Sequence, residues 1–506
     1  MQIIDGFTAL FGNWQPVFFA IFGTLIGLAA GAIPGLTGST TIALLLPVTF
    51  YLDPLSALAL IYTVSKSSDF AGSIPGILFN TPGTPQAAAT SQEGYPLTLQ
   101  GKQGKAMKMA VIASAQGDFL SELLLIFGAA YLAGYAAKMG PPEYVAVYFC
   151  AFIVIASVIG DSVMKGLLST LFGLLLALIG ADAITGFERF DFGFDYLLEG
   201  LSLVPVLLGV LVMSEIFSRV MERGQLESDH KIAPESDKPE DRHVTWAEYK
   251  RCFPVMLRSS AIGTIIGMLP GLGATIASFV AYGEARRVSK SDKWGKGEIE
   301  GIAAAEASNN ATSGANLIPL LTLGIPGSTT AAMLAGVMVI HGMSVGPLVF
   351  IESYDLIYGL FAAGLLCIFT YLVVGYFGSG LVGRAIAMIP VRMIYPFIFV
   401  TCFVAAYAVR GAVFDMVVMF LFGLVGYGMR RTGMSLPAFI IAFILGHGAE
   451  ASLRRTMLLD DDGILIFLER PIALAFFAIG IFTIVMRVNA ARKKSRARAL
   501  SGGVDE

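Results

Sequence analysis

The chain has 506 residues, of which 56% are hydrophobic and only 14% are charged. Soluble proteins carry about 25% charged residues, so this composition excludes an ordinary soluble protein and indicates a multi-pass protein embedded in a lipid bilayer. The formal net charge of −3 offers no basic surface for a phosphate backbone, which excludes nucleic-acid binding, and the four widely spaced cysteines match no zinc or disulfide pattern.

No Lys or Arg precedes Lys66, so the N-terminal region lacks the basic segment of a cleaved signal peptide and is expected to be retained. Uninterrupted apolar stretches further along the chain are each expected to form a membrane helix: 109–137, 144–160, 167–184, 200–218, 355–376, 385–409, 412–428, 435–449 and 464–487. A hydrophilic connector at 219–258 divides the chain into halves, and a basic tail at 488–506 is expected in the cytoplasm.

Four further stretches are apolar but interrupted by Gly, Pro, Ser, Thr and Asn: 24–50, 67–92, 259–282 and 303–340. Five residues of the first stretch recur 236 positions later, namely Gly27, Gly31, Pro34, Gly35 and Leu36 as Gly263, Gly267, Pro270, Gly271 and Leu272. Four positions of the second recur 244 positions later, namely Pro75, Pro82, Gly83 and Thr84 as Pro319, Pro326, Gly327 and Ser328. The ordered matches predict an internal duplication, with repeats at 1–218 and 259–487.

Lys and Arg are distributed oppositely in the two repeats. The loop at 50–56 has none while its counterpart at 286–296 is basic, and the basic loop at 102–108 corresponds to 341–347, which has none. By the positive-inside rule each counterpart lies on the opposite face of the membrane, so the repeats are predicted to be inverted. We expect an all-α polytopic membrane protein with discontinuous helices and hairpins and roughly 11–14 membrane segments.

The orientation of the chain depends on the shape of the first interrupted stretch of each repeat. If 24–50 and 259–282 are hairpins with the Pro-Gly at the tip, the connector and the C-terminus are cytoplasmic and the N-terminus is periplasmic. If each is instead a broken single span, the connector lies outside. We predict the hairpins.

Interrupted helices at mid-membrane favour a transport function. Non-helical backbone is tolerated there only where it lines a protein-enclosed or watery cavity. A helix that starts after Pro-Gly directs free N–H groups toward an anion, and inverted repeats with discontinuous segments are typical of secondary transporters. The plainer alternative is close packing, because Gly and Pro are common in membrane helices and small residues let helices approach.

Three strings resemble a known family: Tyr95-Pro-Leu with Gln100-Gly-Lys-Gln-Gly-Lys-Ala, Gly76-Ile-Leu-Phe-Asn-Thr-Pro-Gly-Thr-Pro, and Ala307-Ser-Asn-Asn-Ala with Ile318-Pro-Leu-Leu-Thr-Leu-Gly-Ile-Pro-Gly-Ser. Over residues 15–450 the chain resembles the large membrane subunit (TctA type) of the tripartite tricarboxylate transporters. The resemblance implies a carboxylate importer of the bacterial inner membrane, with a small membrane subunit and a periplasmic solute-binding protein as partners. It also implies coupling to Na⁺ or H⁺ and no cofactor, and the chain indeed has no ATP-binding Gly-x-x-x-x-Gly-Lys-Ser/Thr loop.

Two departures from the family pattern concern the substrate. The string Ser65-Lys-Ser-Ser-Asp-Phe-Ala-Gly-Ser replaces a Tyr/Gly-rich run, and Asn316 replaces a small residue. Lys66 and Asp69 are three positions apart, so they are expected to pair structurally on one helix face. The alternative is that Lys66 binds a substrate carboxylate while Asp69 binds the coupling proton or sodium.

The interrupted stretches contain no Arg, so we expect recognition by helix N-termini and by hydroxyl or amide donors. The predicted substrate-binding residues are Pro34, Gly35, Thr37, Ser39, Thr40, Pro82, Gly83, Thr84, Gly271, Thr275, Asn310, Pro326, Gly327, Ser328 and Thr329. The predicted ion-coupling residues are Asp69, Glu306, Asn309 and Asn310, because carboxylate and amide oxygens suit a transient Na⁺, and no other metal is expected. Capping or packing roles for the two asparagines stay open, and His341 and His447 are interpreted as interfacial.

The function predicted from these residues is ion-coupled carboxylate import by alternating access. An ion or anion channel, or a carrier for a different organic anion, is the main alternative. An enzyme is not expected because the interrupted stretches contain no nucleophile and base in a catalytic pattern. A purely structural scaffold would not explain duplicated polar interruptions.

Overall fold

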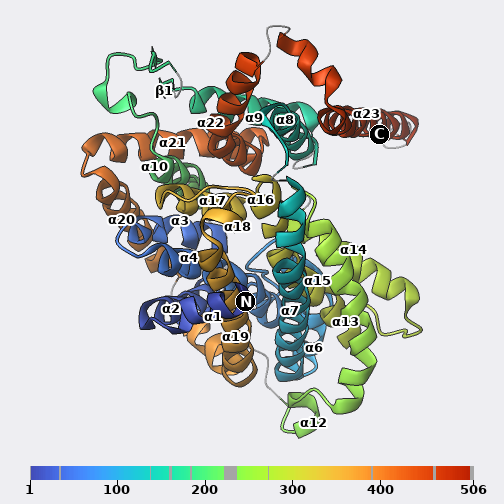
Figure 1. The fold of residues 1–506 in the computed structure, drawn as a ribbon. Helices are drawn as coiled ribbons and strands as arrows, with labels where there is room; N and C mark the ends of the chain where they lie inside the picture. The colour runs from blue at the N-terminus through green and yellow to red at the C-terminus, as the bar shows by residue number, and fades with distance from the viewer. Residues whose placement is uncertain are drawn as a thin grey trace. The chain divides into compact units, whose positions relative to one another are not determined.

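The structure is a computed structural model that describes residues 2–33, 36–136, 138–158, 162–182, 185–221, 236–271, 273–388, 391–459 and 463–501. This part of the chain is almost entirely helical, apart from one antiparallel pair of two-residue strands, β1 (Gly180–Ala181) and β2 (Glu188–Arg189) (Figure 1). Six helices in it are long and apolar enough to cross a membrane: Trp14–Gly31, Gln103–Ala136, Leu203–Met221, Tyr354–Gly378, Val413–Thr432 and Leu436–Leu459. The prediction of an all-α polytopic membrane protein is confirmed.

The chain forms two compact units, and neither coincides with one half of the sequence. Unit 1 consists of Met1–Gly134 and Val204–Tyr427, and unit 2 consists of Tyr135–Leu203 and Gly428–Glu506. All four interrupted stretches belong to unit 1, so both predicted repeats contribute to it.

Within unit 1 the helices of the first half occur in the order α1 (Gln2–Phe11), α2 (Trp14–Gly31), α3 (Gly38–Thr49), α4 (Pro54–Ala71), α5 (Ser73–Phe79), α6 (Ala87–Leu99) and α7 (Gln103–Ala136). The second half repeats the order from α2 onward as α13 (Trp246–Gly267), α14 (Gly273–Val288), α15 (Ile299–Ala315), α16 (Leu317–Leu323), α17 (Thr329–Ile340) and α19 (Tyr354–Met388), with the short α18 (Val349–Glu352) before α19. The elements between or after them are α10 (Leu203–Leu207), the π-helical η2 (Leu208–Met213), α11 (Ser214–Met221), α12 (Pro239–Arg242), α20 (Val391–Arg410) and α21 (Val413–Thr432).

Glycines let α2 pack closely on α4 in the first half, and α13 on α15 in the second. A Cβ on any of these glycines would lie within 3 Å of backbone on the facing helix, so no larger residue fits without movement. The contacts match position by position at an offset of 244 on the facing helix: Gly27 with Val64, Gly31 with Ser68, Gly263 with Ser308, and Gly267 with Thr312. Packing therefore repeats along with sequence.

The order of these contacts gives the direction of the helices. Successive glycines of α2 meet successively later residues of α4, so the two helices run parallel, whereas α3 begins against Ser68 and ends just before α4 begins. Helices α2 and α3 therefore form the hairpin expected at 24–50. The predicted tip residues Pro34 and Gly35 lie outside the described residues, as does Leu272 in the second half.

The second interrupted stretch of each half bends before it breaks. One αR residue, Gly72 or Asn316, separates α4 from α5 and α15 from α16. A proline three positions further on has no N–H to continue the helical hydrogen bonding, which accounts for the bend. The helix then ends at an αL residue, Asn80 (φ 55°) or Gly324 (φ 74°), again 244 positions apart.

Polar contacts bring the basic loops of the two halves together. Ser236 N–H donates to the Gly101 carbonyl (2.9 Å), and Lys105 pairs with Glu248 at 2.7 Å. Gln100 donates to the carbonyl of Lys296 in the other basic loop. The segments 102–108, 236–248 and 286–296 are therefore neighbours, although most of the loop expected at 102–108 is helical because α7 begins at Gln103.

The two loops without Lys or Arg also meet each other. A ring nitrogen of His341, just after α17, lies 3.0 Å from the carbonyl oxygen of Thr49 at the end of α3. His341 is thus placed at a helix end, as the interfacial interpretation expects.

Some predicted boundaries are wrong. The span expected at 167–184 ends at Ala177, because Gly180 adopts φ 117° and the chain turns into β1. The connector expected at 219–258 already becomes α13 at Trp246, where Thr245 and Glu248 form a capping box, and its residues 222–235 lie outside the described part. Most of the tail at 488–506 continues α23 as far as Ser501.

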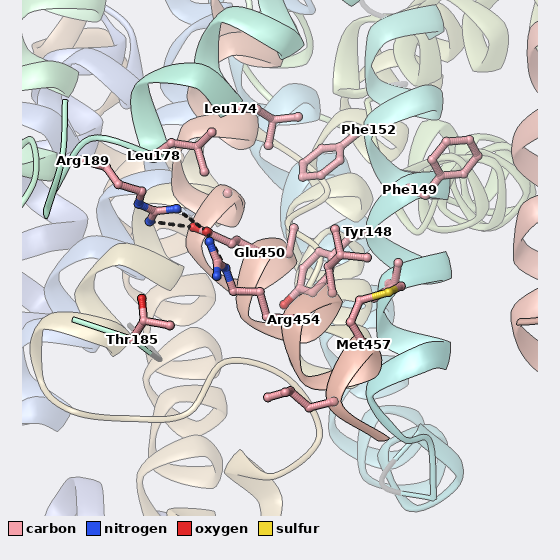
Figure 2. Close-up of a pocket in the computed structure, with 15 residues that line it drawn as sticks. Tyr148, Phe149, Phe152, Leu174, Leu178, Thr185, Arg189, Glu450, Arg454 and Met457 are labelled. Atoms are coloured by element: carbon pink, nitrogen blue, oxygen red, sulfur yellow. Dashed lines mark hydrogen bonds and ion pairs between the residues drawn. The ribbon is translucent and has the colours of Figure 1, made fainter. Parts of the chain in front are cut away.

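Unit 2 consists mainly of α8 (Pro141–Val158), α9 (Val163–Ala177), α22 (Leu436–Leu459), the 3₁₀ turn η3 (Gly463–Glu469) and α23 (Pro471–Ser501). One pocket of this unit is lined mostly by apolar side chains of α8, α9 and α22. At the polar end Arg189 and Arg454 both contact Glu450 (Figure 2). Arg454 also pairs with Asp182 at 2.6 Å. This pocket contains none of the predicted site residues.

Candidate functional site

A cluster of buried charges lies in unit 1 where α4, α7 and α19 meet. Lys66 of α4 is completely buried, and its ammonium lies 2.6 Å from both Asp118 Oδ1 and Glu122 Oε2 of α7. It also donates to the hydroxyl of Tyr62 (3.2 Å), which in turn donates to Glu122. The three donors of the ammonium are thus all used. Tyr371 of α19 completes the cluster by donating to Asp118 Oδ2 (3.2 Å).

A second buried cluster surrounds Glu306 of α15. Its carboxylate accepts hydrogen bonds from Thr90 of α6 and from Ser114 of α7, the latter at 2.9 Å. Asn310, one turn further along α15, donates to Ser114 (2.8 Å) and to the carbonyl of Glu306. Among the described residues no cation lies within ion-pairing distance of this carboxylate. The two clusters share α7, because Ser114, Asp118 and Glu122 follow one another at intervals of four and so lie on one face.

One hydrogen bond between the halves links α4 to α15 directly. Asn309 of α15 donates to the backbone carbonyl of Asp69 (3.1 Å), and the half-buried Asp69 side chain accepts from Gln86 (3.1 Å). The structure therefore places the four predicted ion-coupling residues, Asp69, Glu306, Asn309 and Asn310, at one junction of α4, α6, α7 and α15. Whether they bind an ion stays a prediction.

Several buried oxygen atoms at this junction accept no hydrogen bond from the described residues. They are Oδ1 of Asn309, of Asn310 and of Asn316, and Oε1 of Glu122. Leaving such an atom unsatisfied costs about 1–3 kcal/mol, so four of them point to hydrogen-bond donors or a cation at these positions.

The interruptions come together within each half. In the first, Gly83 N–H donates to the Gly72 carbonyl (2.9 Å), and in the second, Gly271 N–H donates to the Gly327 carbonyl (3.2 Å). The loop after α5 or α16 thus lies against an interrupted segment of its own half. These bonds place the predicted residues Gly83, Gly271 and Gly327 at the breaks.

Most of the predicted hydroxyl-bearing residues lie at the N-terminal ends of α3, α14 and α17. Thr37 caps α3, accepting from the Thr40 N–H, and its hydroxyl also contacts those of Ser39 and Thr40. Ser328 caps α17, where Thr329 is the first residue. Thr275 lies in the first turn of α14, and Thr84 packs on Gly72 without a hydrogen-bond partner for its hydroxyl among the described residues.

A small pocket lies between α4 and the helices α15 to α17. Its polar lining comes from both halves: Tyr62, Ser65, Ser313, Asn316, Ser328 and Thr330. Its volume of about 10 Å³ is close to the minimum for one water molecule. The structure is therefore closed around this position, and a di- or tricarboxylate would require the walls to separate.

The structural pairing expected for Lys66 and Asp69 is wrong. Lys66 pairs with Asp118 and Glu122 instead, because these carboxylates of α7 approach it from the facing helix. With its donors used, Lys66 also has none left for a substrate carboxylate in this state.

Sequence reasoning missed the contribution of α7. Asp118, Glu122 and Ser114 lie inside the stretch 109–137, which reads as an ordinary apolar span. Two carboxylates one turn apart within a membrane segment are a functional signal that could have identified them. Thr90, Tyr62 and Tyr371 carry no comparable signal.

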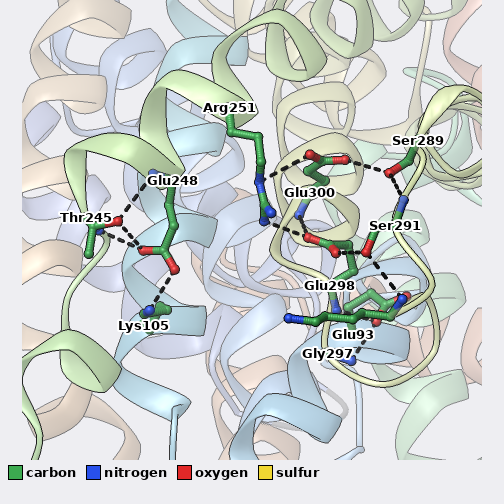
Figure 3. Close-up of polar contacts among 11 residues, drawn as sticks. Glu93, Lys105, Thr245, Glu248, Arg251, Ser289, Ser291, Gly297, Glu298 and Glu300 are labelled. Atoms are coloured by element: carbon green, nitrogen blue, oxygen red, sulfur yellow. Dashed lines mark hydrogen bonds and ion pairs between the residues drawn. The ribbon is translucent and has the colours of Figure 1, made fainter.

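Glu93 of α6 fixes the start of α15, and no motif in the sequence indicates this role. Its fully buried carboxylate accepts from the backbone N–H groups of Gly295, Gly297 and Glu298 at 2.6–2.9 Å and from the hydroxyl of Tyr282 (2.8 Å). Figure 3 shows Glu93 beside Gly297 and Glu298. A negative charge at a helix N-terminus is favourable. A residue of the first half thereby positions the helix that carries Glu306.

Charged side chains reinforce the same helix start from α13. Arg251 pairs with Glu298 (2.8 Å) and with Glu300 (3.3 Å), and Ser289 donates to Glu300 (Figure 3).

Near the basic loops, Ser236 donates to Asp241, and this bond together with Lys102 lowers the pKa of Asp241. The ends of the site helices are thus held by ion pairs.

The fold and the site define a multi-pass membrane protein in which duplicated, interrupted helices surround a buried polar cluster. Comparison with known proteins identifies its family. The model of the Tripartite tricarboxylate transporter TctA family matches residues 17–441, and the chain belongs to this family. It is a transporter subunit of a tripartite system.

Two relatives come from Agrobacterium vitis. An uncharacterized 52.8 kDa protein in the TAR-I ttuC' 3' region is 33% identical over 473 residues, which cover 93% of this chain and 92% of the relative. An uncharacterized protein in the TAR-II ttuC' 3' region is 32% identical over 227 residues, which cover 44% of this chain and 93% of the relative.

Proposed function

We propose that the chain imports a di- or tricarboxylate across the bacterial inner membrane by ion-coupled alternating access, receiving its substrate from a periplasmic binding protein and assembling with a small membrane subunit. The observation that carries the proposal is the junction of the two interrupted halves, where Asn309 binds the backbone of Asp69 beside the buried Glu306. Secondary transporters bind solute and coupling ion at such a junction of discontinuous repeats.

The neighbouring loops support inverted repeats. The basic loops 102–108 and 286–296, which are not counterparts in the duplication, adjoin each other, and the uncharged segments near Thr49 and His341 do the same. If each group lies at one membrane face, counterpart loops lie on opposite faces. The basic group would be cytoplasmic and would include the connector after Ser236.

Anion binding is assigned to the helix starts. The N-cap residues Thr37 and Ser328 lie at interruptions, and the first turns of α3 and α17 direct N–H groups away from the helix. With no Arg in these stretches, such donors attract a carboxylate without holding it too tightly for release.

Ion coupling is assigned to Glu306 with Asp69, Asn309 and Asn310. A buried carboxylate with only neutral hydroxyl donors needs a proton or a metal cation to offset its charge. Binding of that cation would make the site electrically suited to an anionic substrate, so the two would move together.

Reconstitution tests the proposal. The purified chain with its small membrane subunit is placed in liposomes, the periplasmic binding protein is supplied outside, and uptake of radiolabelled di- and tricarboxylates is measured under imposed Na⁺ or H⁺ gradients. We expect saturable accumulation that needs the binding protein and one gradient. Large single-channel conductance, or accumulation of another class of organic anion only, would contradict it.

A further inference from the structure

The two buried clusters, one around Lys66 and one around Glu306, lie at equivalent positions of the duplicated helices α4 and α15. Because α4 corresponds to α15 with an offset of 244, Lys66 corresponds to Asn310 and Tyr62 to Glu306. Both pairs contact polar side chains on the same face of α7. The site on α4 contains a cation supplied by the chain, and the site on α15 contains none among the described residues.

The ammonium of Lys66 occupies a position suited to a small metal cation. It is surrounded by oxygen atoms from Asp118, Glu122 and Tyr62 at 2.6–3.2 Å, and no part of it is exposed. Carboxylate and hydroxyl oxygens are also the ligands of hard cations. The lysine therefore fills a site that would otherwise require an ion from solution.

The site on α15 has the complementary arrangement. The Glu306 carboxylate, the hydroxyls of Thr90 and Ser114 and the amide oxygens of Asn309 and Asn310 provide oxygen atoms, and both amide Oδ1 atoms accept no hydrogen bond from the described residues. Asp69 of the facing helix α4 brings a second carboxylate to this region, and its backbone carbonyl accepts from Asn309. The position lacks only the cation that Lys66 supplies on the other side.

We propose that Lys66 is a tethered cation, which permanently fills the ion position of the first half and leaves only the Glu306 position for an exchangeable monovalent cation. Calling that cation the coupling ion rests on the proposed function, whereas the binding of one ion does not. A chain with this arrangement exchanges one cation at the paired sites instead of two.

Cation binding to the purified full-length protein tests the inference without transport. Melting temperature in detergent is measured against Na⁺ at constant ionic strength with choline, and separately against pH without Na⁺, which distinguishes a metal ion from a proton. Wild type should show one saturable stabilisation, and Glu306→Gln should show none. Lys66→Ala should gain a second one, because two carboxylates and a hydroxyl are left without their cation.

Two combined variants guard against failure of Lys66→Ala to fold. Lys66→Ala with Asp118→Asn keeps the net charge of the cluster and should also gain a second cation. Adding Glu122→Gln to this double variant removes the last carboxylate of the Lys66 cluster. The triple variant should therefore show one saturable stabilisation by cation, as the wild type does. A single response in both Lys66→Ala and its Asp118→Asn combination, or an unchanged response in Glu306→Gln, would overturn the inference. Absence of carboxylate uptake with this cation pattern intact would reject the proposed function alone.

Discussion

Helices α4 and α15 show how one duplicated element acquires two kinds of chemistry. Each is packed closely by a helix whose glycines face it, α2 on α4 and α13 on α15. Each also bends at one αR residue and contacts α7. Yet α4 presents Lys66, whose charge is offset by two carboxylates, whereas α15 presents Glu306 with only hydroxyl and amide neighbours. The shared backbone therefore sets the position of a site, and a few side chains decide whether it is filled from within the chain.

The largest effect on transport is expected from changing Glu306 on α15, whose charge is not offset by a cation among the described residues. Glu306→Gln keeps the shape of the side chain, but it replaces one accepting oxygen by a donating NH2 group and removes the charge that would hold a coupling ion. We expect ion-driven uptake in proteoliposomes to be lost while the protein still folds. Glu352→Gln, the same change at an exposed carboxylate outside both clusters, serves as the comparison. Wild-type uptake by Glu306→Gln would remove Glu306 from the coupling mechanism.

Substitution of Lys66 on α4, which pairs with two carboxylates, should mainly lower the free energy of unfolding. Lys66→Ala leaves two buried carboxylates without a cation, and breaking a buried ion pair in this way costs about 3–5 kcal/mol. Asn310→Ala at the equivalent position loses neutral hydrogen bonds only, for about 1–3 kcal/mol. Denaturant unfolding in micelles measures both free energies, and a smaller loss for Lys66→Ala would mean that water or ions compensate the carboxylates.

The N-terminal ends of α15 and α4 are stabilised to different extents, which gives a third comparison. Glu93→Ala exposes three backbone N–H groups before α15, and we expect a loss on the order of 3 kcal/mol. Asp53→Ala removes a single N-cap bond to Ser56 before α4 and should cost about 1 kcal/mol. The difference in melting temperature between the two variants measures the contrast. Equal values would show that Glu93 is not a specific anchor.

The smallest effect is expected at the paired αL positions. Gly324→Ala forces a Cβ into φ 74° and should cost roughly 1–2 kcal/mol, while Asn80→Gly relieves a non-glycine residue at φ 55° and should change stability little. Thermal unfolding of the two variants compares them. Destabilisation by Asn80→Gly would indicate a role for the Asn80 side chain.

Sequence alone predicted the helical class, the interrupted stretches and the residues that meet at the junction. Gly and Pro control backbone shape locally, so their spacing reports where helices bend, as at Pro75 and Pro319. Amide and carboxylate side chains inside apolar segments are costly, which is why Glu306 and Asn309 could be selected without coordinates.

The partners of these residues could not be predicted in the same way. Lys66 binds residues of α7 more than 50 positions later, and Glu93 binds backbone groups about 200 positions later. Which helix faces which depends on the packing of the whole unit, and a backbone N–H has no sequence signature. The incorrect Lys66–Asp69 pairing came from considering only neighbours on one helix.

The long separation between Thr90 and Glu306 has a consequence for biosynthesis. Membrane proteins are made from the N-terminus, and the first half is complete before α15 exists. Lys66 can pair with Asp118 and Glu122 at that stage, whereas Thr90, Ser114 and Glu93 have their partners only after α15 has been synthesised. A chain stopped midway would therefore leave the Glu93 carboxylate and these hydroxyls without the partners that they have in the complete chain.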